Sequence, residues 1–498
     1  MSTSPSTPAA PTADATTDPG RVDPAVWRLA FTIITGAMAV VFDTTILSVA
    51  LHDVAADLDA SLGTIQWVST GYLLAMFVTI PLAGWAQARF GGRRLWAGSL
   101  AVFLLGSVLC PLAWNAPSLI AFRLVQGVGG GIMMPLMTTL IMQAAKGRNI
   151  GKVIATISLP VALGPILGPV LGGVILGLGD WRWLFLVNIP FCAIGLHLAL
   201  RNLPDDRPAP DAPRPRLDIV GLLLLSPGVA AVIYGLSQVE GDAGPTSARV
   251  LVPLVAGLLL VAAFARWAWP RASNALVDLT LLRHRNVTAA AVLGFLSGIT
   301  LYGAMLLLPL YFQQARGSDA LAAGLLLIPQ GVGTLLSRTV VGKYTDTFGP
   351  RRVSFVGFTV VALGTLPFAF VTESTGDTLL MAVLFVRGFG MGGATIPLTS
   401  AMYVGLKPAE IPDTSVLQRV VQQLGGSVGT ATLAVILQHA LADAHTPAAL
   451  ADGFGTAFWW ATAFTAIGIP LTLLLPGRTK APAEPEETTD GAVNTARP

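Results

Sequence analysis

Charged side chains are scarce in this chain. Lys, Arg, Asp and Glu make up 11% of its 498 residues, hydrophobic residues make up 53%, and the mean hydropathy is +0.69. An ordinary soluble domain carries roughly 25% charged residues, so a water-soluble fold is excluded. Cysteine is also scarce, because only Cys110 and Cys192 occur, both inside apolar segments. Two such thiols exclude a disulfide framework and a thiolate metal site.

The chain lacks the motifs of an enzyme or of an ATP-driven pump. Its five histidines do not cluster, and it contains no Walker-type phosphate loop and no loop-borne acid pair or nucleophile. The net charge of +3 is small and the basic residues are scattered, which does not favour nucleic-acid binding. We therefore predict a protein that is not an enzyme and that binds no metal, no cofactor and no nucleic acid.

Long apolar runs recur along the whole chain. Each is about 20 residues long, the length that an α-helix needs to cross a hydrocarbon core of ~30 Å. Continuous runs such as residues 221–231 differ from the short alternating segments of a membrane β-barrel. We predict an all-α membrane protein with fourteen transmembrane helices, over residues 27–50, 66–86, 95–113, 117–142, 150–176, 183–201, 217–237, 249–269, 287–312, 320–341, 353–372, 378–401, 414–438 and 455–476.

Basic residues lie mainly on one side of this arrangement. Of the 30 Lys and Arg residues, 24 fall in tails and loops on the side of the N-terminus, against Arg182, Arg249 and Arg316 on the other side. The positive-inside rule therefore predicts that both termini are cytoplasmic, in a bacterial inner membrane. The polar segments 1–25 and 477–498 are predicted to be disordered cytoplasmic tails.

Two copies of one loop motif indicate an internal repeat. Residues 84–94 follow the second predicted span, and the similar residues 342–352 follow the tenth, 258 positions later. Arg123 and Arg387 each open a glycine-rich stretch, 264 positions apart. Paired six-span halves are the parallel-repeat plan of secondary transporters, which bind substrate near the membrane midplane. The predicted parts are a six-helix half, an inserted helix pair and a second six-helix half, over residues 26–203, 204–270 and 271–476.

Asp43 is the one acidic residue of the 27 that falls well inside a predicted span. A carboxylate at that depth costs at least ~2.5 kcal/mol on insertion scales, so it indicates a function. Arg123, in the fourth span, lies at a similar depth of about 10 Å when counted at about 1.5 Å per residue. We predict that the two pair, and that proton binding at Asp43 competes with this pairing. The alternative is an ion pair that only fixes helix packing.

Four motifs resemble those of the fourteen-span drug:proton antiporters of the major facilitator superfamily. The resemblance runs from about Trp27 to about Pro476, and the motifs are residues 43–50, 123–131, 164–173 and 181–190. It implies the major facilitator fold and alternating access, with Asp43 and Arg123 in proton coupling. It also implies export of small lipophilic drugs or toxic compounds in exchange for protons, and a monomeric protein whose partners are its substrate and the lipid bilayer.

The fifth span combines glycine and proline in an unusual way. Glycines at four-residue spacing give a smooth face for close helix packing, and prolines allow bending. This combination favours a moving seal, whereas static helix packing explains any single glycine equally well. The predicted gating residues of this span are Gly164, Pro165, Gly168, Pro169, Gly172 and Gly173.

The repeated loop is also predicted to act in gating. The family usually carries an Asp just before the first Arg, and Ala88 stands there instead, whereas the second copy keeps its acid. We predict a weaker cytoplasmic latch in the first half; the alternative is that the arginines only set topology. The predicted loop residues are Gly84, Arg89, Gly91, Arg93 and Arg94 in the first copy and Gly342, Asp346, Gly349 and Arg351 in the second.

Polar residues at mid-span depth are candidates for the substrate cavity, although they can equally bond a neighbouring helix. They are Tyr72, Gln126, Gln330, Arg387 and Gln422. One deep acid suits neutral or monocationic substrates, because one entering proton returns the electrical work of exporting one positive charge, about 2.3 kcal/mol per 100 mV. Dedicated export of one endogenous metabolite, such as an antibiotic or siderophore, is the open alternative within transport.

Overall fold

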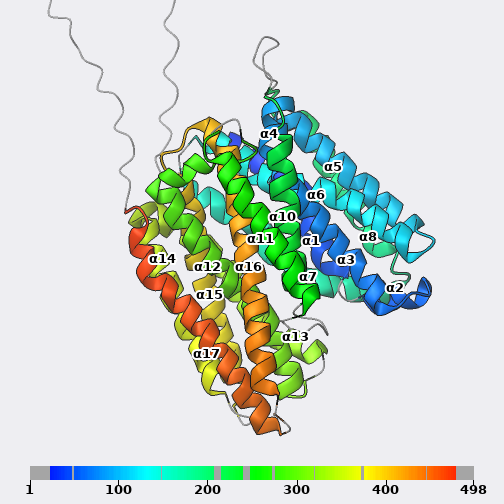
Figure 1. Cartoon of the computed structure of the whole chain (residues 1–498), viewed down its shortest axis with the longest axis vertical. Coiled ribbons are helices and arrows are strands. Elements are labelled where there is room, and N and C mark those ends of the chain that lie inside the picture. Colours follow the sequence, from blue (N-terminus) through cyan, green and yellow to red (C-terminus); the bar gives the residue numbers. More distant parts are fainter. Residues whose placement is uncertain are drawn as a thin grey trace, which may run out of the picture. The chain divides into compact units, whose positions relative to one another are not determined.

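The computed structural model of the chain describes residues 23–47, 50–146, 149–206, 215–238, 247–271, 275–318, 320–371, 375–442, 444 and 446–477. Within these ranges every regular element is a helix, as Figure 1 shows. The predicted all-α fold is therefore confirmed. Most residues of the two predicted tails lie outside these ranges.

Within the described ranges, nine α-helices precede the inserted segment. Their bounds are α1 (Pro24–Ile46), α2 (Leu51–Asp57), α3 (Leu62–Thr79), α4 (Leu82–Phe90), α5 (Gly92–Leu109), α6 (Ala116–Ala145), α7 (Ile150–Leu178), α8 (Trp183–Leu186) and α9 (Asn188–Asn202). Local sequence explains the start of α6. Asn115 accepts a hydrogen bond from the Ser118 backbone at 2.9 Å, and Ser118 Oγ accepts one from the Asn115 backbone at 3.2 Å, a reciprocal cap.

Eight further α-helices follow in the part of the chain that the structure describes. Their bounds are α10 (Ile219–Ser237), α11 (Ala248–Ala268), α12 (Arg285–Leu310), α13 (Ala320–Phe348), α14 (Pro350–Thr365), α15 (Asp377–Met402), α16 (Ile411–Leu441) and α17 (Pro447–Leu471). A π-helical turn, Tyr311–Ala315, continues α12. Within the described ranges, eleven helices are long and apolar enough to cross a membrane, and the pair α3 and α4, bent by 57°, raises the number to twelve.

The chain divides into two compact units. The first comprises Met1–Val232, Val255–Leu279 and Gly405–Val420, and the second comprises Ile233–Leu254, Thr280–Val404 and Val421–Pro498. In the first unit α6 packs against α3 and α5, and α1 packs against α7 and α9. In the second unit α15 packs against α13 and α14, and α12 packs against α17. The two units therefore repeat one packing scheme.

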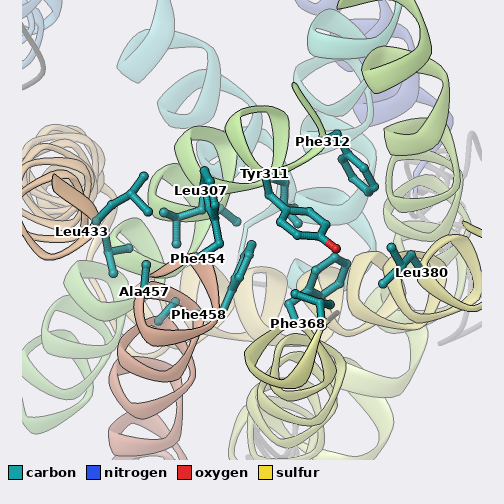
Figure 2. Packing of buried hydrophobic residues seen from close by; sticks show 14 of the residues in the cluster. Leu307, Tyr311, Phe312, Phe368, Leu380, Leu433, Phe454, Ala457 and Phe458 are labelled. Carbon is teal, nitrogen blue, oxygen red and sulfur yellow. The ribbon is translucent and has the colours of Figure 1, made fainter. Parts of the chain in front are cut away.

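The second unit contains an aromatic core. Tyr311 lies at its centre, with its ring centroid 5.8 Å from that of Phe454, 6.0 Å from that of Phe458 and 6.1 Å from that of Phe368, as Figure 2 shows. Its neighbours are edge-on to it, the arrangement that aromatic quadrupoles favour. This core connects the π-helical turn to α17 and to the 3-10 helix Leu366–Phe370, which follows α14.

Polar contacts within the first unit hold its parts of the inserted helices α10 and α11. Ser226 Oγ donates to the Val78 carbonyl of α3 at 2.7 Å. Asp218 accepts hydrogen bonds from Trp267 Nε1 and from the Leu276 backbone, each at 3.1 Å. A carboxylate before α10 thus fixes the end of α11 and the chain that follows it.

Candidate functional site

Asp43 lies on α1 and contacts Arg123 of α6. Arg123 Nη1 donates to Asp43 Oδ2 at 2.5 Å, and each of the two residues is 1% exposed. The predicted contact is therefore present. A charged hydrogen bond of this kind is roughly twice as strong as a neutral one.

Two amides complete the shell of the Asp43 carboxylate. Gln126 Nε2 and Asn188 Nδ2 both donate to Oδ1, at 2.9 Å and 2.8 Å. Gln126 Nε2 also donates to Ser107 Oγ at 2.8 Å, and Gln126 Oε1 accepts from Arg123 Nη1 at 2.7 Å. Four helices, α1, α5, α6 and α9, thus meet in one buried network.

The Arg123 guanidinium is held on two further sides. Its Nε donates to the Val68 carbonyl at 3.2 Å, and its Cζ lies 3.9 Å from the centre of the Tyr72 ring. The Tyr72 hydroxyl is buried and has no hydrogen-bond partner among the described residues. Tyr72 and Gln126, predicted for the substrate cavity, are thus packed into the charged network.

This network compensates a buried negative charge. Every donor to Asp43 stabilises the carboxylate, and Arg123 neutralises it. Without the carboxylate charge the Arg123 cation would be buried without its partner, which is strongly unfavourable.

Helix α7 approaches α1 on both sides of Asp43. A Cβ at Gly164 would lie 2.4 Å from Val41 Cγ1, and one at Gly168 would lie 2.0 Å from Thr45 Oγ1. Thr45 Oγ1 donates to the Gly164 carbonyl at 3.1 Å. Only glycine permits this approach, so part of the glycine face contacts the turn that carries the carboxylate.

The other predicted residues of this span differ. Gly172 is buried, whereas Gly173 is exposed and a Cβ there would meet nothing within 4 Å. The side chains of Pro165 and Pro169 lie outside the described residues. Close packing therefore explains Gly164 and Gly168 but not Gly173.

The first loop motif is contacted by a carboxylate from another segment of the chain. Gly91 adopts a positive φ of 79° and precedes α5. Asp206, after α9, accepts hydrogen bonds from the Gly92 and Arg93 backbones at 2.6 Å and 3.1 Å, and so caps α5. A carboxylate suits the positive end of a helix. Ala88 is exposed and takes no part in this cap.

In each copy of the loop motif an arginine donates a hydrogen bond to a carbonyl at or just after the end of a helix of the same unit. Arg93 Nη2 donates to the Leu200 carbonyl near the end of α9. In the second copy Arg351 Nε donates to the Leu475 carbonyl, just after α17, at 2.8 Å. Gly349, with φ 85°, precedes α14 as Gly91 precedes α5.

The remaining loop residues lie around these contacts. Gly84 and Gly342 are buried, Arg89 is half-buried, and Arg94 and Asp346 are exposed. A Cβ at Gly84 would lie 2.8 Å from Asp413 Oδ1, so α4 also requires a glycine there. A gating role of these residues stays a prediction.

Arg387 forms a second buried cluster, in the second unit. Its Nε donates to Thr365 Oγ1 at 3.0 Å, Nη1 to Gln330 Oε1 at 2.8 Å and Nη2 to the Thr300 carbonyl at 3.3 Å. Arg387 and Gln330, both predicted for the cavity, are thus in direct contact. Gln422 is half-buried, and its carbonyl lies against Gly298 of α12.

Sequence reasoning did not single out Asn188, Ser107 or Asp206. Asn188 and Ser107 are polar residues inside apolar spans, and that signal was available. Asp206 gave no signal, because an acid in a polar loop is ordinary. The described residues contain no group of His, Cys, Asp or Glu that could hold a metal ion.

Comparison with known proteins identifies relatives over most of the chain. The family profile of the Major Facilitator Superfamily matches residues 33–430. A "Multidrug resistance protein B homolog" from Mycobacterium tuberculosis (strain ATCC 25618 / H37Rv) is 39% identical over 423 residues, which are 84% of this chain and 78% of the relative. "Lincomycin resistance protein LmrB" from Listeria monocytogenes serovar 1/2a is 28% identical over 80% of this chain and 83% of its own length.

Solved structures share the fold at low sequence identity. The human organic anion transporter MFSD10 (TETRAN) superimposes with a TM-score of 0.61 at 15% identity, covering 90% of this chain and 100% of that chain. The proton:xylose symporter XylE gives 0.57 at 17% identity, covering 90% and 96%. These likenesses show a common helical architecture.

Proposed function

The chain belongs to the major facilitator superfamily, and from this membership we propose that it is a secondary transporter exporting lipophilic drugs or toxic compounds in exchange for protons. The observation that carries the proposal is the buried pair of Asp43 and Arg123. A carboxylate that is ionised only while paired can take a proton when the pair opens, which couples proton movement to alternating access.

The names of the relatives support export. A multidrug resistance protein homolog and a lincomycin resistance protein match about four fifths of this chain. We infer that the substrates are neutral or monocationic lipophilic compounds. Dedicated export of one endogenous metabolite is the second candidate, and the lincomycin resistance relatives, named for a single antibiotic, favour it.

We assign the chain to the fourteen-span branch. Besides the eleven helices and the bent pair that meet the length and polarity of a membrane span, Ile219–Gly235 is a shorter apolar helix and α7 extends over 29 residues. Together they make fourteen. The distribution of Lys and Arg supports cytoplasmic termini in a bacterial inner membrane, and one chain with both halves supports a monomer.

The test is gradient-driven flux of ethidium, a fluorescent lipophilic monocation, in proteoliposomes. Asp43→Asn keeps the shape of the side chain but cannot ionise. We expect the native protein to transport when a proton gradient is imposed, and Asp43→Asn to lose that flux while still binding the dye. Asp452→Asn, which changes an exposed acid near the start of α17, is the matched control. Equal flux in Asp43→Asn would show that the buried pair is only structural.

A further inference from the structure

The glycines of α6 and α15 define how the two units correspond. A Cβ at Gly127 would meet the Tyr72 carbonyl at 2.5 Å, and one at Gly388 would meet the Gln330 carbonyl at 2.1 Å. Four residues further along each helix, Gly131 and Gly392 face the hydroxyls of Thr79 and Ser337 in the same way. Both pairs are 261 positions apart (388 − 127 and 392 − 131), three residues less than the 264 positions that separate the two arginines.

Arg387 therefore occupies the position of Gln126, and the alignment of Arg387 with Arg123 in the sequence is out of register. Hydrogen bonding agrees with this correspondence. Gln126 Nε2 donates to Ser107 Oγ, and Arg387 Nε donates to Thr365 Oγ1. The first unit thus has an amide where the second has a cation.

Among the described residues, no anion pairs with the Arg387 cation. Arg387 is 1% exposed, and its three acceptors are a hydroxyl, an amide oxygen and a backbone carbonyl, all neutral. No ion pair among the described residues includes it. Removing an unpaired charge from water carries a large desolvation penalty, so its retention here indicates a ligand.

The Arg387 guanidinium also has N–H donors that no acceptor in the described part of the chain uses. Arginine carries five N–H groups in a planar fork, and the three acceptors use one each on Nε, Nη1 and Nη2. One N–H on Nη1 and one on Nη2 therefore remain without an acceptor in the described part of the chain. Two donors at the end of the fork match the two oxygens of a carboxylate.

We propose that Arg387 binds the carboxylate of a monoanionic apolar substrate in the second unit. The inference rests on the proposed transport function and widens its substrates to lipophilic weak acids. Gln330, which is half-buried and whose Oε1 accepts a hydrogen bond from Arg387 Nη1, orients the guanidinium toward the carboxylate.

The test compares two ligands of one shape on the purified full-length protein in detergent. 9-Anthracenecarboxylate carries the anion, and 9-anthracenecarboxamide is its neutral counterpart. Equilibrium dialysis of the native protein should give at least about tenfold tighter binding of the carboxylate, which corresponds to about 1.4 kcal/mol. Native protein that binds both ligands equally would overturn the proposal without any variant.

Variants then test whether the preference for the carboxylate ligand arises at Arg387. Arg387→Gln places in α15 the residue that the first unit has at the corresponding position, and it should bind both ligands equally. Arg387→Lys keeps the charge and should retain part of the preference. Arg352→Gln, an exposed arginine in α14, is the control and should behave as the native protein. An undiminished preference in Arg387→Gln would place the anion elsewhere and overturn the assignment.

Dialysis uses no proton gradient, so its result is independent of the flux assay. Native protein that shows no gradient-driven ethidium flux but keeps the carboxylate preference would contradict proton coupling and leave the anion site standing. Native protein that transports ethidium but shows no preference for the carboxylate would overturn the anion site and leave proton coupling standing.

Discussion

Asp43 is surrounded by donors that favour its ionised form. The sequence predicts its contact with Arg123, because depth along two helices can be counted and a buried charge needs a partner. The roles of Gln126 and Asn188 could not be predicted in the same way. An uncharged amide in a span can bond any neighbouring helix, and only the packing of α9 against α1 brings Asn188 to the carboxylate.

Asn188→Ala removes one donor from the Asp43 carboxylate. A hydrogen bond to a charged group is worth about 1.5 kcal/mol or more, so its loss should lower the melting temperature and reduce gradient-driven ethidium flux. Thermal unfolding in detergent and the proteoliposome assay measure the two effects. Asn202→Ala is the control, because Asn202 lies on the same helix and donates to Thr32 Oγ1 instead. An unchanged melting temperature and flux in Asn188→Ala would contradict this role.

Helix positions were the most predictable elements. The predicted spans 117–142 and 249–269 correspond to α6 and α11 within three residues at either end. Run length does not reveal local breaks, however. Several breaks depend on backbone hydrogen bonds that an apolar run does not encode. They are the bend between α3 and α4, the short helices α2 and α8, and the π-helical turn at Tyr311.

Helix α7 permits a direct comparison of two glycines. Gly168→Ala places a methyl group against Thr45, and overpacking of this kind costs about 1–3 kcal/mol. We expect a lower melting temperature and reduced ethidium flux, because the turn with Asp43 is displaced. Gly173→Ala meets open space and should be neutral or more stable by up to about 1 kcal/mol. Thermal unfolding in detergent and the flux assay measure both effects, and equal behaviour of the two variants would refute the assigned contact.

Helix α5 depends on a cap from a distant segment. Asp206→Ala removes the acceptor for the first N–H groups of α5 and should destabilise the protein by about 1 kcal/mol. Asp206→Asn keeps an acceptor and should lose less. Thermal unfolding distinguishes the two. If both variants match the native protein, water replaces the cap and Asp206 has no structural role.

Asp43 is the one acidic residue that is fully buried in the described part of the chain. Exporting each positive charge against an inside-negative potential costs roughly 2.3 kcal/mol per 100 mV, and one entering proton returns that amount once. We expect ethidium flux to be insensitive to membrane potential and flux of propidium, a related dication, to be opposed by it. The measurement is flux at a fixed proton gradient with the potential set by potassium and valinomycin. Efficient propidium export driven by potential alone would refute coupling through a single acid.

The loop contacts of Arg93 and Arg351 have a consequence for the origin of the molecule. In the first unit the start of α5 contacts the end of α9, and in the second unit the start of α14 contacts the segment after α17. Neither contact draws on the other unit. The same closure in both units is the pattern expected from duplication of one ancestral helical segment, whose copies would then have diverged at the Asp43 and Arg387 clusters.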